Sequence, residues 1–261
     1  MATGPSAGQC KDDDSNKAVI LGNRGGFAYT GLAAIGRVKT DLWLAQTLAD
    51  ARARTLSDAC AAIESRATEA FRRIRDPQIK RHAFVGVGWA RYQTDGPVVP
   101  VICVVSNALD EDGEWLGKAH PRFITRFYGM ADDSRVMLRT TGQYVGLKEK
   151  HYILRNAYKC ILKGVGPETI LTLLADRIRR VADRNPTVGK NLMALSLPIG
   201  SADSDMYAAT MSLPQPNVPS FCYLPENETN FVQGSPWVVN EYFIGQLQSS
   251  WVQPQNTDQD P

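Results

Sequence analysis

The chain has 261 residues, of which 43% are hydrophobic, and a formal net charge of +2 at pH 7. This length and composition suffice for one large globular domain. The nearly balanced charge lacks the basic excess of a nucleic-acid-binding protein, and no apolar run has the length of a membrane span or the form of a signal peptide. We therefore expect a cytoplasmic protein with neither nucleic-acid nor membrane partners.

Polar segments bound the predicted domain at both ends. Residues 1–16 are small, polar and acidic without periodicity, which predicts a flexible N-terminal arm. Residues 248–261 form a second polar segment, which we expect to be a disordered tail. Between them, residues 17–247 are predicted to fold as a single domain.

The first structured stretch predicts a β-hairpin followed by a helix. Two apolar runs, residues 18–21 and 27–31, flank the turn Gly-Asn-Arg-Gly-Gly at 22–26, whose Gly and Asn residues suit a tight turn. A helix is expected from about Val38. Because side chains around Gly31 are small, we expect an open corner there that a ligand or another chain can approach closely.

The remaining elements predict an α+β protein. Helical periodicity predicts helices over residues 55–75 and 167–184, which Pro77 and Pro186 end and the second of which Pro167 starts. The stretch at 143–162 is ambiguous, with a helix expected over residues 148–161. Apolar or alternating runs predict strands over residues 82–92, 98–105, 114–119, 123–128, 134–141, 191–197, 206–211, 220–224 and 237–239. The short connections in the middle of the chain favour an antiparallel meander.

No metal, cofactor or standard catalytic motif emerges from residue spacing. The histidines His82, His120 and His151 lack ligand spacing, so ordinary, partly exposed histidines are the favoured interpretation and no metal or cofactor is expected. The Gly-rich turn lacks the Lys-Ser/Thr pair of a phosphate loop, and there is no GxSxG or HExxH sequence. The five scattered cysteines predict reduced, mostly buried thiols (Cys10, Cys60, Cys103, Cys160 and Cys222).

Three segments in order resemble a known superfamily. They are KAVIL at 17–21, GFAYTG at 26–31 and Thr40-Asp41 at the start of a helix. Together they resemble the proteasome β-subunit branch of the N-terminal nucleophile (Ntn) hydrolases, and the sequence NPTVG at 185–189 before a strand extends the resemblance to residue 197. The chain is more similar to bacterial single-chain relatives than to ring-forming subunits. The resemblance implies a four-layer αββα sandwich.

The resemblance also implies a reaction and roles for particular residues. It implies hydrolysis of a peptide or small amide by a free N-terminal Thr, Ser or Cys, activated by its own α-amino group or by water. Lys17 matches the lysine that favours the ionised nucleophile, and the Gly31 amide matches the oxyanion donor. Thr187 and Gly189 match a neighbouring loop, whereas Asn185 departs from the acidic residue found near that position.

The nucleophile has no match in this sequence. In the family, two strands precede the lysine and carry the nucleophile, whereas sixteen residues precede Lys17, too few for two strands and a turn. Ala2-Thr3-Gly4 resembles the segment that follows the second strand, and Cys10 lies seven residues before Lys17. We therefore expect a domain without its first two strands and without hydrolytic activity.

Three interpretations stay open. The chain is truncated, which the match of Ala2-Thr3-Gly4 favours; it is a non-catalytic structural or binding subunit of a proteasome-like assembly; or it is an unrelated binding module. An incomplete sheet would expose an unpaired edge, so we also expect self-association.

Overall fold

The computed structural model describes residues 17–22, 24–74, 81–91, 96–109, 116, 118–129, 136–139, 146–185, 188, 190–197, 220–226, 232–233, 237–239 and 244–246. The predicted arm at 1–16, the predicted tail at 248–261 and the predicted strand at 206–211 lie outside these residues.

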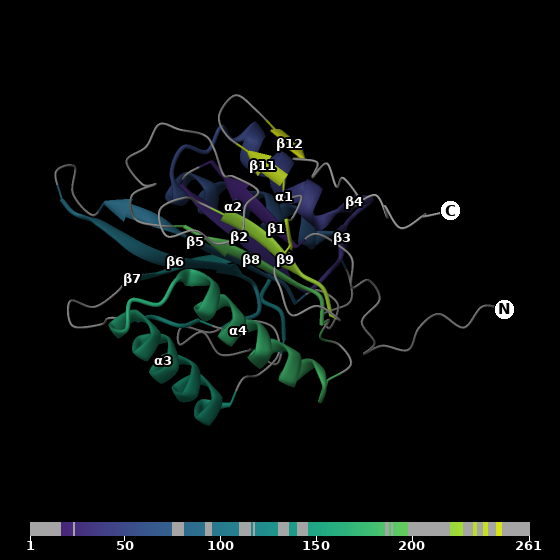
Figure 1. The fold of residues 1–261 in the computed structure, drawn as a ribbon. Helices are drawn as coiled ribbons and strands as arrows, with labels where there is room; N and C mark the ends of the chain where they lie inside the picture. The colour runs from purple at the N-terminus through teal and green to yellow at the C-terminus, as the bar shows by residue number, and fades with distance from the viewer. Residues whose placement is uncertain are drawn as a thin grey trace, which may run out of the picture.

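A large mixed sheet forms the centre of the described protein (Figure 1). Within the described residues it has seven strands in the order β12-β11-β1-β2-β5-β6-β7. Neighbouring strands are antiparallel except β11, which runs parallel to β1. The strands are β1 (Ala18–Leu21), β2 (Gly25–Thr30), β5 (Ala83–Arg91), β6 (Val98–Ser106), β7 (Ile124–Gly129), β11 (Trp237–Val239) and β12 (Ile244–Gln246).

The predicted hairpin and the antiparallel meander are confirmed, whereas two further predicted strands are not seen in the residues that the structure describes. Ala18 pairs with Ala28 across β1 and β2, and β5, β6 and β7 follow one another antiparallel. The described residues of 114–119 and 134–141 form no strand. In the first of these segments, the Leu116 N–H donates to the Ala108 carbonyl at 2.8 Å, so Leu116 lies close to the end of β6.

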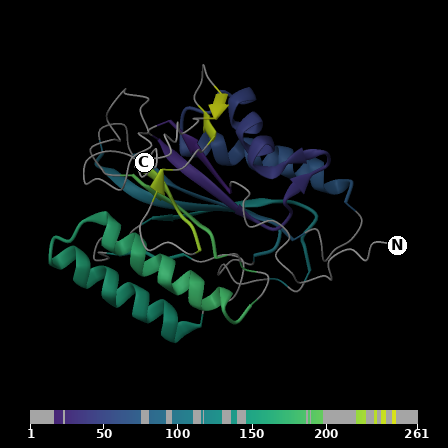
Figure 2. The ribbon, with the colours of Figure 1, turned by 45° about the vertical axis from the view of Figure 1, so that its right-hand side comes forward.

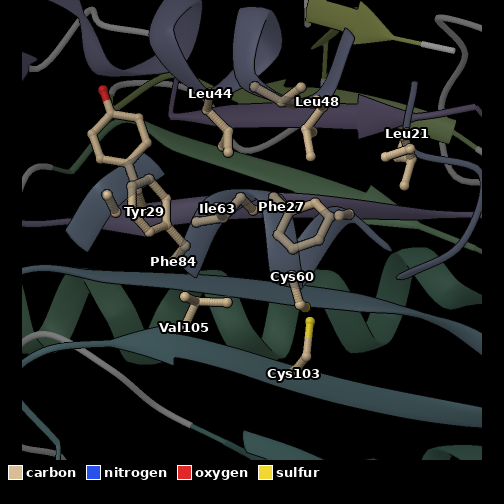
Figure 3. Packing of buried hydrophobic residues seen from close by; sticks show 14 of the residues in the cluster. Leu21, Phe27, Tyr29, Leu44, Leu48, Cys60, Ile63, Phe84, Cys103 and Val105 are labelled. Atoms are coloured by element: carbon tan, nitrogen blue, oxygen red, sulfur yellow. The ribbon is translucent and has the colours of Figure 1, made fainter. Parts of the chain in front are cut away.

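Helices α1 (Thr40–Asp50) and α2 (Leu56–Arg72) cover one face of the large sheet (Figure 1). Thr55 and Asp58 form a reciprocal capping box that fixes the start of α2. The core between helices and sheet includes Leu44 and Leu48 of α1 and Ile63 of α2, which meet side chains of β2, β5 and β6 (Figure 3). A short hairpin, β3 (Ala34–Ile35) with β4 (Val38–Lys39), precedes α1.

A smaller sheet packs against the opposite face of the large one. Its described strands, in the order β10-β9-β8, are β8 (Leu192–Ser196), β9 (Ser220–Leu224) and β10 (Val232–Gln233). The two sheets share an apolar cluster of Ala18, Ile20, Phe221 and Val238. They approach each other closely at Gly26, where an added Cβ would collide with Leu195.

Helices α3 (Leu147–Leu162) and α4 (Pro167–Ala182) lie on the far side of the small sheet from α1 and α2 (Figure 2). Ala175 of α4 packs with Leu192, Cys222 and Leu224 of the small sheet. Both helices confirm the predicted ranges, with Pro167 in the first turn of α4. The protein is therefore a mixed α+β fold, as the sequence predicts.

Candidate functional site

Lys17 and Gly31 lie at the same end of neighbouring strands. Lys17 immediately precedes β1, Gly31 immediately follows β2, and both are exposed. The register that pairs Ala18 with Ala28 places Lys17 across from Tyr29, two residues before Gly31. This offset is roughly 7 Å along the strand, so the two residues predicted to support one site belong to one corner of the sheet. The Lys17 main-chain N–H also donates to Met193 Sδ of β8 at 3.2 Å, which brings the small sheet to the same corner.

His82 fills the Gly31 corner on the side where a side chain at position 31 would lie, although Gly31 itself is exposed, so the open corner that the sequence predicts is present on one side only. Gly31 has a φ of +121°, and a Cβ there would collide with His82 Nδ1 and lie 2.8 Å from the Arg81 carbonyl oxygen. The close approach that glycine permits is therefore made by a residue of the same chain. His82 was predicted to be partly exposed; this prediction is wrong, because the side chain is fully buried.

His82 and Thr40 hold the residue after Gly31 from both sides. The Leu32 N–H donates to His82 Nδ1 at 3.1 Å, and Thr40 Oγ1 donates to the Leu32 carbonyl at 2.8 Å. Burial lowers the pKa of His82 to about 3, so the imidazole is neutral at physiological pH. Sequence reasoning missed the burial of His82, although its position directly before the apolar strand β5 was a usable signal.

Asp41 has a structural partner far away in the sequence. Its carboxylate is buried and accepts a hydrogen bond from Trp237 Nε1 of β11 at 3.1 Å. This contact joins the first turn of α1 to β11 of the large sheet. Asp41 thus anchors the helix that follows the Gly31 corner.

The C-terminal part of the predicted site is only partly visible. Thr187 and Gly189 lie outside the described residues, as do Thr3 and Cys10. Asn185 follows α4, where its N–H donates to the Ala182 carbonyl at 3.2 Å. The structure thus brings Lys17 and Gly31 together and leaves the placement of the other two predicted residues untested.

Cys60 and Cys222 do not supply a reactive thiol. Cys60 of α2 and Cys103 of β6 point toward each other in the core (Figure 3). Their hydrogen bond, together with burial, raises the pKa of Cys60, and burial followed by the charge of Glu168 raises the pKa of Cys222 to about 12. Both thiols are protonated at neutral pH, whereas the thiolate is the nucleophilic form.

A groove lies elsewhere, between α2 and β7. It encloses about 510 Å³ and is lined by Arg72, Arg122, Glu64 and Glu69 among others, but by neither Lys17 nor Gly31. Glu64 and Thr68 of α2 accept the main-chain N–H groups of Thr125 and Phe123 at 2.9 and 3.0 Å. These bonds tie α2 to the edge of β7, so we assign the groove a structural origin.

Within the described ranges, no group of three or more His, Cys, Asp or Glu side chains could hold a metal ion. Among the helices described, none is long and apolar enough to cross a membrane.

Comparison with known proteins identifies no relative of this chain. No family model, no curated protein and no solved structure matches the chain. Functional inference therefore depends on the residues and their placement.

Proposed function

We propose that this chain is a homologue of the proteasome-like Ntn hydrolases that holds the supporting half of an amide-hydrolysing site. The observation that carries the proposal is the placement of Lys17 and Gly31 at one end of the paired strands β1 and β2. An ammonium group favours an ionised nucleophile, and a main-chain N–H stabilises a developing oxyanion. The two groups can assist the same reaction only if both lie close to the carbonyl that is attacked. The substrate would be a peptide or a small amide.

The order of the packed elements supports a four-layer αββα sandwich as part of this proposal. Helices α1 and α2 pack on the large sheet, the small sheet packs on its other face, and α4 packs on the small sheet. Each of these three contacts is apolar. This order of layers is the one that the sequence resemblance implies.

The edge of β8 is the position that we propose for the nucleophile-bearing strands. In the described residues, β8 ends the small sheet and lies next to Lys17 through Met193. Ala28 of β2 is exposed although it shares a strand face with the buried Gly26, which Leu195 of β8 approaches closely. Strands paired with β8 would cover Ala28 and would run past the Lys17–Gly31 corner. This chain, without a matched nucleophile, is proposed to be inactive.

An assay of the full chain tests this function directly. Fluorogenic peptide amides should show no turnover, and a peptide epoxyketone, which traps an N-terminal threonine, should add no mass to the protein. A single labelled peptide that begins with Thr, Ser or Cys would show that a nucleophile is present after all. If turnover is observed after all, and labelling of an internal side chain abolishes it, the chemistry would lie outside the Ntn hydrolases.

The second candidate is a non-catalytic structural or binding subunit of a proteasome-like assembly. It is favoured by apolar side chains on α3, of which Leu147 is 66% and Leu162 is 60% exposed. Exposed apolar surface and unpaired strand edges promote association between chains. We expect light scattering to show a mass that rises with concentration, whereas a monomer throughout the concentration series would contradict this candidate.

A further inference from the structure

His82 lies beneath the Gly31 corner in a cluster of aromatic rings. Its ring centroid is 5.8 Å from that of Tyr29, 5.3 Å from Phe71 and 4.6 Å from Phe84. The ring is fully buried. A phenylalanine would fill such a site without bringing polar atoms into it, whereas an imidazole carries two nitrogens that are costly to bury without hydrogen bonds.

Only one of these nitrogens has a partner in the described structure. Nδ1 accepts the Leu32 N–H, so the ring proton of the neutral imidazole must reside on Nε2. Nε2 is buried without a hydrogen-bond partner among the described residues. An unsatisfied N–H is unfavourable, so packing alone does not explain a histidine here. The acceptor at Nδ1 is the contribution that a phenylalanine could not make.

The main chain of His82 is itself held by β6 and the residue that follows it. The His82 N–H donates to Asn107 Oδ1 at 2.9 Å, and Ser106 Oγ donates to the His82 carbonyl at 3.0 Å. The imidazole therefore projects from a fixed support. Gly31 in turn lies between Thr30, which pairs with Ala83, and Leu32, which His82 and Thr40 hold.

The geometry points to His82 as the positioning residue of the Gly31–Leu32 corner, where its Nδ1 fixes the main chain that presents the Gly31 N–H. The role of that N–H toward an oxyanion rests on the proposed function, whereas the hold on the corner does not. His82 also explains the glycine, because the imidazole fills the space that a side chain at position 31 would need.

Hydrogen exchange of the Leu32 amide in the full chain tests this role. His82→Leu removes the acceptor, and His82→Asn keeps an acceptor close to the position of Nδ1. Phe84→Leu is the matched control, because it removes a ring from the same cluster without touching Leu32. After correction for global stability, we expect Leu32 to exchange about tenfold faster or more in His82→Leu and at a near wild-type rate in both other variants.

Equal exchange rates of the Leu32 amide in His82→Leu and Phe84→Leu would overturn the inference, because they would show that the imidazole contributes only packing. If His82→Leu does not fold, ring ¹⁵N shifts of the wild-type protein decide the matter. A proton on Nε2 and an accepting Nδ1 support the inference, and a proton on Nδ1 overturns it. Neither readout needs hydrolysis, so failure of the positioning role is distinguishable from failure of the proposed function.

Discussion

Helices α2 and α3 have similar lengths and similar apolar stripes, but their coverage differs greatly. Six of the 17 residues of α2 are buried, from Leu56 to Phe71. In α3, with 16 residues, only Ile153 and Ala157 are buried, while Leu147, Tyr152, Ile161 and Leu162 are exposed. Polar contacts supplement the packing of α3, because Glu149 pairs with Arg177 of α4 at 2.9 Å.

The difference lies in what each helix packs against. Helix α2 rests on β5, β6 and β7 of the large sheet, whereas α3 packs mainly on α4 (Figures 1 and 2). An amphipathic pattern therefore specifies a face that can be buried, and the neighbouring sheet decides whether it is. The less covered half is the one beside β8, where we propose that the nucleophile-bearing strands belong.

The largest effect on stability is expected when a buried isoleucine of α2 is truncated, and truncation of an exposed isoleucine of α3 is the matched comparison. Ile63 of α2 is 0% exposed and Ile161 of α3 is 48% exposed. Ile63→Ala should lower the free energy of unfolding by about 2–5 kcal/mol, because it leaves a cavity, whereas Ile161→Ala should change it by about 0.5 kcal/mol or less. Urea denaturation measures both values. Similar losses for the two variants would remove the distinction between the helices.

Acid should lower the free energy of unfolding through His82, which packs on Phe71 of α2. Burial lowers the pKa of His82 from 6.5 to about 3, and its ring neighbours Tyr29, Phe71 and Phe84 are uncharged. Between these two pKa values the unfolded chain binds the extra proton. The contribution of the neutral His82 to the free energy of unfolding is therefore fully present above pH 6.5. It falls as the pH drops toward 3, by up to about 1.4 kcal/mol per pH unit.

His82→Asn isolates this contribution, because the variant has no titrating ring and all carboxylates are unchanged. Urea denaturation of both proteins at pH 7, 5 and 4 gives the difference. The wild-type protein should lose more stability than His82→Asn on acidification. Parallel losses would show that His82 is protonated in the folded state.

A smaller effect should report the contact between the two sheets. An added Cβ at Gly26 collides with the end of the Leu195 side chain, and its other neighbours are at ordinary contact distances. Gly26→Ala should therefore cost about 1–2 kcal/mol, and part of this cost should vanish when Leu195 is already alanine. A double-mutant cycle in urea measures the coupling. Strict additivity would contradict the packing of β8 on β2.

The smallest effect on stability should accompany a clear effect on association. Leu162→Lys places a charge on the exposed surface of α3. Ala61→Lys is the control, because it places the same charge at an exposed position of α2. Both should change the free energy of unfolding by about 0.5 kcal/mol or less. Only Leu162→Lys should reduce self-association in light scattering. Equal association of both variants and the wild type would remove α3 from the interface.

Local signals in the sequence predict much of this fold. The Gly-rich turn predicts the β1–β2 hairpin, and its register alone brings Lys17 and Gly31 to one end. Pro167 predicts the start of α4, because its fixed φ acts within one turn, and the periodicity from Thr55 predicts α2.

Contacts between distant segments escape such reasoning. The parallel pairing of β1 with β11 and the bond from Trp237 to Asp41 join segments that no local pattern connects. His82 was misjudged for the same reason, since its burial depends on rings from β2 and α2 and on the main chain of Leu32. The predicted roles of Thr187 and Gly189 stay predictions.

Native-state hydrogen exchange across α2 and α3 tests most directly whether the half of the molecule beside β8 is incompletely covered, as the position proposed for the nucleophile-bearing strands requires. We expect the slowest amides of α2 to exchange only through global unfolding. Those of α3 should exchange about a hundredfold faster or more, through local opening. Equal protection of the two helices would show that α3 is fully covered in the folded chain, and would contradict an open position beside β8.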